Sequence, residues 1–102
     1  MTEQTAAPTV VRNEERSRYE AWFGDTLAGI AAYREHGDRT VFTHTEVDAA
    51  FKGKGVAKAL AATALDDVVR RGHVIVPACP FIADYLTKHG QYEEHVRRPD
   101  GS

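Results

Sequence analysis

The chain has 102 residues, a formal net charge of −2, 42% hydrophobic residues and 27% charged residues. This length predicts one domain, and the composition is that of a globular protein rather than a disordered one. Because no segment is strongly basic, we expect no nucleic-acid binding driven by phosphate neutralisation.

The cysteine count and the hydropathy exclude several further classes. The single cysteine, Cys79, cannot form an intrachain disulfide and argues against a cysteine-based zinc site, so we expect no metal. No apolar run approaches the ~18 residues of a membrane-spanning helix, and no signal peptide is recognisable. We therefore expect a cytoplasmic protein without a membrane partner.

The first part of the chain is rich in strand signals. Residues 1–9 are polar and predict a flexible tail, which precedes a single domain over residues 10–98. A strand-like pattern starts at Val10 and reaches Phe23 with apolar and polar residues in alternation. We interpret this segment as the first strand of a sheet.

Two more strands are predicted by the runs Leu27–Glu35 and Arg39–Val47, which contain many residues that favour strands. Glycine–aspartate pairs at 24–25 and 37–38 are turn signals that separate the runs. Three consecutive strands joined by short turns predict an antiparallel meander.

Helical periodicity follows the third strand. Apolar residues spaced four apart form one stripe that we expect to face the core: Leu60, Ala61, Ala64, Leu65, Val68 and Val69. Gly72 is placed to end this helix. The segment His73–Cys79 then predicts a short buried strand, and Pro80 can open a second helix that ends near Gly90.

The last segments are less regular. Residues Gln91–Arg98 predict a short strand or an irregular segment, and residues 99–102 a frayed end. The element order is an antiparallel meander followed by helix, strand and helix. It predicts an α+β fold with a mixed sheet, in which a right-handed crossover follows the strand that ends at Val47.

A cationic glycine-rich loop, KGKGVA at 52–57, precedes the first helix. Glycines allow close approach of a ligand, and the free amides of a helix start bind phosphates. The spacing fits neither a Walker A loop nor a dinucleotide-binding fingerprint. From the spacing alone, an anion site and a plain glycine turn into the helix are both open readings.

This loop resembles the GNAT superfamily of acetyl-CoA-dependent N-acetyltransferases, whose loop is (Arg/Gln)-x-x-Gly-x-(Gly/Ala). Lys52 stands where that family has Arg or Gln. The segments HTEV at 44–47 and PACPF at 77–81 are similar to a short, single-domain subgroup of GNAT-like proteins. The similarity runs from about Tyr19 to Tyr92.

The resemblance implies a binding site for acetyl-CoA. The loop backbone would cradle the pyrophosphate, and the pantetheine arm would lie along the strand ending at Val47, where the strands before and after the helix splay apart. The residues expected to bind the cofactor are Val47, Lys52, Gly53, Lys54, Gly55, Val56, Ala57 and Lys58.

The sequence departs from the family pattern in two places: the helices that form the acceptor site, and the tyrosine that protonates the departing coenzyme A thiolate. Residues 10–23 leave no space for the acceptor-side helices that usually follow the first strand, so we expect a minimal version of the fold without them. The family's acid tyrosine aligns with Leu86. Tyr85 is its neighbour, but one residue is about 100° of rotation on a helix.

Three residues are candidates for the chemistry. Glu46 and His44 share one face of the strand that would border the thioester, so either is a candidate base. The alternatives are that Glu46 is an ordinary surface glutamate and that His44 is a strand histidine held by a hydrogen bond. Cys79 ends a strand where the positive field of the next helix would favour a thiolate, which could accept acetyl covalently. The alternative is a small buried hydrophobe.

Together these features predict a small N-acetyltransferase that moves acetyl from acetyl-CoA to an amine acceptor, as a monomer or homodimer. One alternative is a non-catalytic coenzyme A-binding or sensor module, which would account for the missing helices and tyrosine. Another is an interaction domain whose glycine loop is only a turn.

Overall fold

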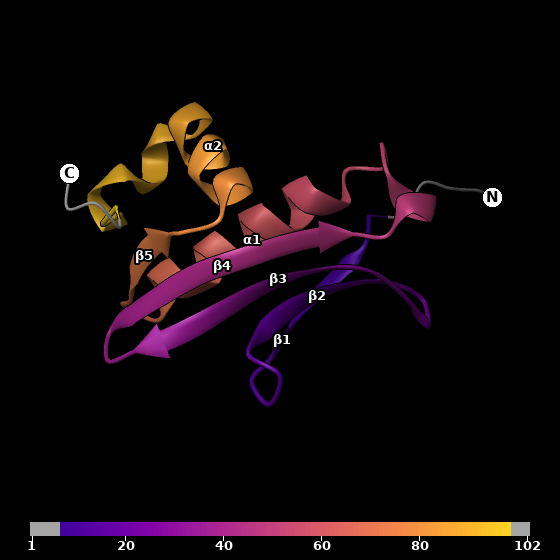
Figure 1. The fold of residues 1–102 in the computed structure, drawn as a ribbon, viewed down its shortest axis with the longest axis horizontal. Helices are drawn as coiled ribbons and strands as arrows, with labels where there is room; N and C mark the ends of the chain where they lie inside the picture. Colours follow the sequence, from indigo (N-terminus) through magenta and orange to yellow (C-terminus); the bar gives the residue numbers. More distant parts are fainter. Residues whose placement is uncertain (1–6, 99–102) are drawn as a thin grey trace.

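The computed structural model describes residues 7–98 (Figure 1). Its elements, in chain order, are β1 (Thr9–Asn13), β2 (Arg18–Phe23), β3 (Thr26–His36), β4 (Arg39–Val47), the 3₁₀ helix η1 (Ala49–Phe51), α1 (Val56–Arg70), β5 (Val74–Pro77), α2 (Pro80–Lys88) and the 3₁₀ helix η2 (Gly90–His95). Most of the expected tail, residues 1–6, and the expected frayed end, residues 99–102, lie outside the described residues.

The strands form one sheet in the order β1-β2-β3-β4-β5. The first four strands pair antiparallel, and β5 pairs parallel with β4 after α1 has crossed between them. The predicted α+β fold, a meander followed by helix, strand and helix, is therefore confirmed. Between residues 7 and 98 no helix precedes Ala49, in agreement with the minimal fold that we expected.

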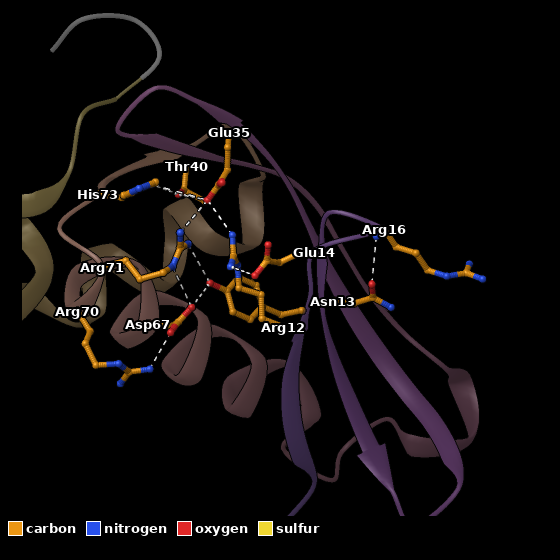
Figure 2. Close-up of polar contacts among 11 residues, drawn as sticks. Arg12, Asn13, Glu14, Arg16, Glu35, Thr40, Asp67, Arg70, Arg71 and His73 are labelled. Carbon is orange, nitrogen blue, oxygen red and sulfur yellow. Dashed lines mark hydrogen bonds and ion pairs between the residues drawn. The ribbon is translucent and has the colours of Figure 1, made fainter.

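The meander has four strands rather than the three predicted, because the segment 10–23 folds as a hairpin. Asn13 Oδ1 accepts a hydrogen bond from the backbone amide of Arg16 at 3.1 Å (Figure 2). Ser17 takes a φ of 52°. An asparagine side chain that bonds its own backbone ahead is a common turn device. The polar run of residues 13–17 was the sequence signal for this turn.

The segment 91–98, predicted as a short strand or an irregular segment, is mostly η2. A single parallel bridge joins Val96 to Ile75 of β5, and the Arg97 amide donates to the Ile75 carbonyl at 2.8 Å. Tyr92 fixes η2 against α1, since its hydroxyl donates to Asp66 at 2.6 Å.

The helices lie on one side of the sheet and leave its other face open (Figure 1). The expected apolar stripe of α1 is buried against the sheet, except for half-buried Val69: Leu60, Ala61, Ala64, Leu65 and Val68. No helix of the described residues is long and apolar enough to cross a bilayer. The same residues contain no cluster of three or more potential metal ligands.

The start of α1 touches the sheet at Gly29, which has no side chain to hold it away. A Cβ at this position would lie 2.8 Å from the Glu46 carbonyl oxygen, 3.0 Å from Val56 Cγ1 and 3.3 Å from Leu60 Cδ1. The distance to the carbonyl oxygen is shorter than real Cβ contacts, so a residue with a side chain could stand here only if the backbone shifted. The contact fixes the helix start against β4.

The other end of α1 is held to the sheet by polar side chains (Figure 2). Arg71 lies between two carboxylates: its Nη1 donates to Glu35 at 2.9 Å and its Nε to Asp67 at 3.2 Å. Arg12 of β1 donates to the same Glu35 oxygen at 3.2 Å, and the Tyr19 hydroxyl donates to Asp67 at 2.7 Å.

These contacts change the ionisation of both carboxylates. Partial burial acts to raise the pKa of Glu35, but the hydrogen bond and charge of Arg71, with the charge of Arg12, outweigh it and lower that pKa. The pKa of Asp67 is lowered in the same way against its burial, chiefly by hydrogen bonds from Tyr19 and the neighbouring arginines. Both groups are therefore more stable as carboxylates in the folded chain.

We expect Glu35→Gln to lower the free energy of unfolding by about 1 kcal/mol at pH 7. Because the folded-state pKa is depressed, this contribution is complete above the unfolded-state value of about 4.3 and is lost as the pH falls through the folded value. Urea unfolding at pH 7 and at pH 3 measures the difference between variant and parent. A difference of equal size at both pH values would contradict the account; the exposed control Glu94→Gln should change little at either.

Candidate active site

The glycine loop connects η1 to α1 through two residues in the left-handed region. Gly53 has a φ of 81° and Gly55, which precedes the first turn of α1, has a φ of 76°. Side chains with a Cβ avoid this region, which explains the glycines at both positions. The two glycines therefore set the direction in which α1 begins.

The start of α1 carries free backbone donors. Gly55 offers no capping side chain, and the first helical bond runs from the Ala59 amide to the Gly55 carbonyl at 3.0 Å. The amides of Val56, Ala57 and Lys58 therefore have no partner within the helix. Since the positive end of the helix dipole lies here as well, the loop can bind an anionic group through its backbone.

An open groove of about 500 Å³ lies in front of this helix start. Seven of the eight residues expected to bind the cofactor line it: Val47, Lys52, Gly53, Gly55, Val56, Ala57 and Lys58. The eighth, Lys54, does not. Phe51 and Phe81 complete the lining and were not predicted as site residues, although Phe81 belongs to the CPF segment that carried the resemblance.

Each type of lining residue contributes differently. Val56 is only 2% exposed, so its side chain belongs to the core although the residue also lines the groove. Lys52, Lys54 and Lys58 are exposed, and among residues 7–98 none of them forms an ion pair. The groove thus combines backbone donors with mobile positive charge, which suits a polyanion such as a pyrophosphate.

Strands β4 and β5 part beside the groove. Their pairing runs from Arg39 with Val74 to Phe42 with Pro77 and ends there, whereas β4 continues to Val47. Thr43 is a bulge, because Phe42 pairs with Tyr33 and the next pair joins His44 to Ala32. The second half of β4 consequently presents backbone groups on its β5 side that no strand of the described residues uses.

Cys79 lies in the gap between the parted strands. Its thiol donates to the Thr45 hydroxyl of β4, with 3.4 Å between Sγ and Oγ1, and the residue is only 4% exposed. It precedes α2 as the N-cap residue but makes no side-chain capping bond. Cys79 does not line the groove, although Phe81, two residues later, does. Its catalytic role stays a prediction.

His44 and Glu46 share the open face of the sheet, as strand alternation predicted. Their side chains are 62% and 70% exposed, and His44 Nε2 lies 3.9 Å from Glu46 Oε1. Glu46 also lines a second hollow of about 420 Å³, together with Ile30, Asp48 and neighbouring residues. Val47 lines both hollows, so the two hollows adjoin at the end of β4.

Helix α2 offers no ready acid at the position of the family's tyrosine. Leu86, which stands there, has no ionisable group and is buried in the core at 1% exposure. Burial raises the pKa of the Tyr85 phenol, and the charge of Asp66 raises it further. A raised pKa makes Tyr85 a weaker acid.

Comparison with known proteins was consistent with this geometry. Residues 18–96 match the family model of the GCN5-related N-acetyl-transferases. The chain is also 38% identical over 71 residues to Protein NATD1 of Gallus gallus, an alignment that covers 67% of this chain. The match spans 64% of the length of that relative, slightly less than two thirds.

We expect Gly55→Ala to weaken binding of inorganic pyrophosphate and to lower the free energy of unfolding by about 1–2 kcal/mol, because its φ of 76° is costly for any residue with a Cβ. Binding is followed by the amide NMR shifts of residues 53–58. Gly24→Ala is the matched control, since Gly24 has a φ of 60° and equally open surroundings. It should lose similar stability and bind pyrophosphate unchanged. Equal binding by both variants would show that the loop conformation does not matter for the anion.

Proposed function

Because the chain belongs to the GCN5-related N-acetyltransferase family, we propose that it binds acetyl-CoA in the groove before α1 and transfers the acetyl group to an amine. The observation that carries this proposal is the groove itself, which is lined by seven of the eight residues expected from the sequence. The cytoplasmic location and the monomeric or homodimeric state stay predictions.

Binding would divide the coenzyme between two kinds of surface. The amides of Val56, Ala57 and Lys58 would hold the pyrophosphate, and the unpaired lysines would add attraction that salt weakens. The apolar walls, Phe51 and Phe81, would cover the pantetheine arm. The free backbone of β4 beyond Phe42 would offer it hydrogen bonds in the manner of an added strand.

For the transfer, bound acetyl-CoA supplies an activated thioester. The amine nitrogen would form a bond to the acetyl carbon, the carbon–sulfur bond would break, and coenzyme A would leave as a thiolate. Glu46 would accept the proton that the acceptor ammonium loses before its nitrogen attacks, and the second proton of that nitrogen would pass through water to the thiolate. His44, 3.9 Å away, would hold the carboxylate in position or accept the proton in its place.

We expect Glu46→Gln to lower the rate of acetyl transfer about 100-fold and to leave the affinity for acetyl-CoA nearly unchanged, because it removes a base and no cofactor contact. The measurement is thiol release from acetyl-CoA with a panel of primary amines, together with calorimetric binding. Glu14→Gln, an exposed change in the β1–β2 turn, is the control.

Binding without turnover on every amine would favour the alternative function, a non-catalytic coenzyme A-binding module. The buried Leu86 at the acid position supports that alternative.

Cys79 offers a second route, in which its thiol takes the acetyl group first and passes it to the amine. The short distance between Cys79 Sγ and Thr45 supports it, because this contact places the thiol where β4 and β5 separate.

If the route through Cys79 operates, intact mass spectrometry after mixing with acetyl-CoA will show one added acetyl group on the parent chain and none on Cys79→Ala. An equal adduct on both proteins, or no adduct on the parent, excludes this route and leaves direct transfer. Cys79→Ser, which keeps a similar size, controls for a loss of packing in the gap.

A further inference from the structure

The face of the sheet that carries no helix has an apolar middle (Figure 1). Tyr19, Ala31 and Phe42 belong to the core on the helix side, so the alternate residues of each strand point the other way. Each of the four antiparallel strands contributes to a set that we call the apolar band: Val11, Trp22, Ile30, Ala32 and Val41. Val11 is 44% exposed, and the other members of the band are half-buried.

A buried carboxylate on the same face holds part of this surface in a fixed shape. Glu20 is only 5% exposed and accepts hydrogen bonds from Trp22 Nε1 at 3.3 Å and from Arg18 Nε at 2.7 Å. Asn13 Nδ2 donates to it at 3.2 Å. Tryptophan and arginine are residues that often dominate the energy of protein–protein contacts. Because both side chains are already ordered here, a partner that binds them has less to immobilise.

The two ends of the face carry opposite charges. By strand alternation, Arg34 and Arg39 lie on it near the β3–β4 turn, where both are exposed and neither forms an ion pair with any residue from 7 to 98. Glu46 and Asp48 lie on it at the other end of β4, and both are exposed. The apolar band lies between these ends, because its β3 and β4 members extend from the level of Glu46 to that of Arg34.

This distribution of charge fits a second copy of the chain. A twofold axis that lies between two stacked sheets and crosses their strands places the basic end of one copy over the acidic end of the other. The two apolar bands then meet, and the contact between opposite charges forms twice, once at each end. A membrane surface or a nucleic acid presents one sign of charge, so one end of this face would repel it.

We propose that the open face of the sheet is the interface of a homodimer, in which two chains stack sheet to sheet with the basic end of each against the acidic end of the other. The starts of α1 and α2, which line the groove, lie on the other side of the sheet and stay clear of the second chain. The inference goes beyond the proposed function and needs no acetyl-CoA. Glu46 lies at the margin of the interface, so an amine would reach it from the side where β4 extends past β5.

The test is sedimentation equilibrium of the full chain from micromolar to millimolar concentration. We expect a monomer–dimer equilibrium with a dissociation constant of about 10 μM, near the weak end of the range for specific interfaces. Because the contacts between the ends are electrostatic, this constant should rise when salt is added.

Two variants test the two parts of the face. Arg34→Glu reverses a charge at the basic end, and Val11→Lys puts a charge into the apolar band; each should weaken the dimer about tenfold. Both side chains are exposed in the single chain, so circular dichroism should show an unchanged fold. Arg70→Glu is the matched control. It makes the same charge change at a side chain that is 71% exposed on α1, on the helix side of the sheet, and should dimerise as the parent does.

Four results would overturn the inference. A parent chain that stays monomeric at millimolar concentration would show that a second copy does not cover this face. A dimer that neither variant weakens would have its interface elsewhere. Loss in Val11→Lys with Arg34→Glu unchanged would assign the contact to the free edge of β1. Equal losses in Arg34→Glu and Arg70→Glu would mean that net charge, and not this face, determines association.

Discussion

The separation of β4 from β5 is the constraint on which the rest of the site depends. β5 has four residues and ends at Pro77, which pairs with Phe42, while β4 runs on to Val47. The bulge at Thr43 falls at this point and interrupts the regular alternation of β4. Beyond this point β4 has no strand partner on its β5 side among residues 7–98, and Cys79 lies in the gap against Thr45. Glu46 lies on the outer face of the same strand end. A sheet paired along its whole length would have no such gap.

Helix α1 is held at both of its ends beside this opening. At its start, Gly29 lets Val56 and Leu60 approach the sheet backbone. At its end, Arg71 joins Glu35 of the sheet to Asp67 of the helix. With the helix fixed at both ends, its free amides have a set direction relative to β4. Preorganised backbone donors of this kind bind anions without a cost for rearrangement.

Local patterns of the sequence predicted most of this architecture. The period-two runs, the stripe from Leu60 to Val68 and the glycine loop each describe structure that depends on neighbours in the chain. The hairpin within residues 10–23 was missed because its turn carries no glycine and depends on one asparagine side chain, Asn13. The segment 91–98 was ambiguous because the contact between Tyr92 and Asp66, 26 residues apart in sequence, decides its form.

The sequence predicted those residues of the candidate site that lie close together in the chain, and it missed the contacts between distant segments. The loop residues form one continuous motif, and all but Lys54 line the groove. Phe51 and Phe81 come from two separate elements and meet in the groove only after α1 has folded, so no local pattern could identify them as partners. The contact between Thr45 and Cys79 likewise needs the parallel pairing of β4 with β5.

We propose that the helix start and the free end of β4 together form the binding site of acetyl-CoA. A crystal structure of the chain with acetyl-CoA tests this. We expect the pyrophosphate at the amides of residues 56–58 and the pantetheine arm along β4 between Thr43 and Val47. A coenzyme bound away from these two segments, or none bound at millimolar acetyl-CoA, would contradict it.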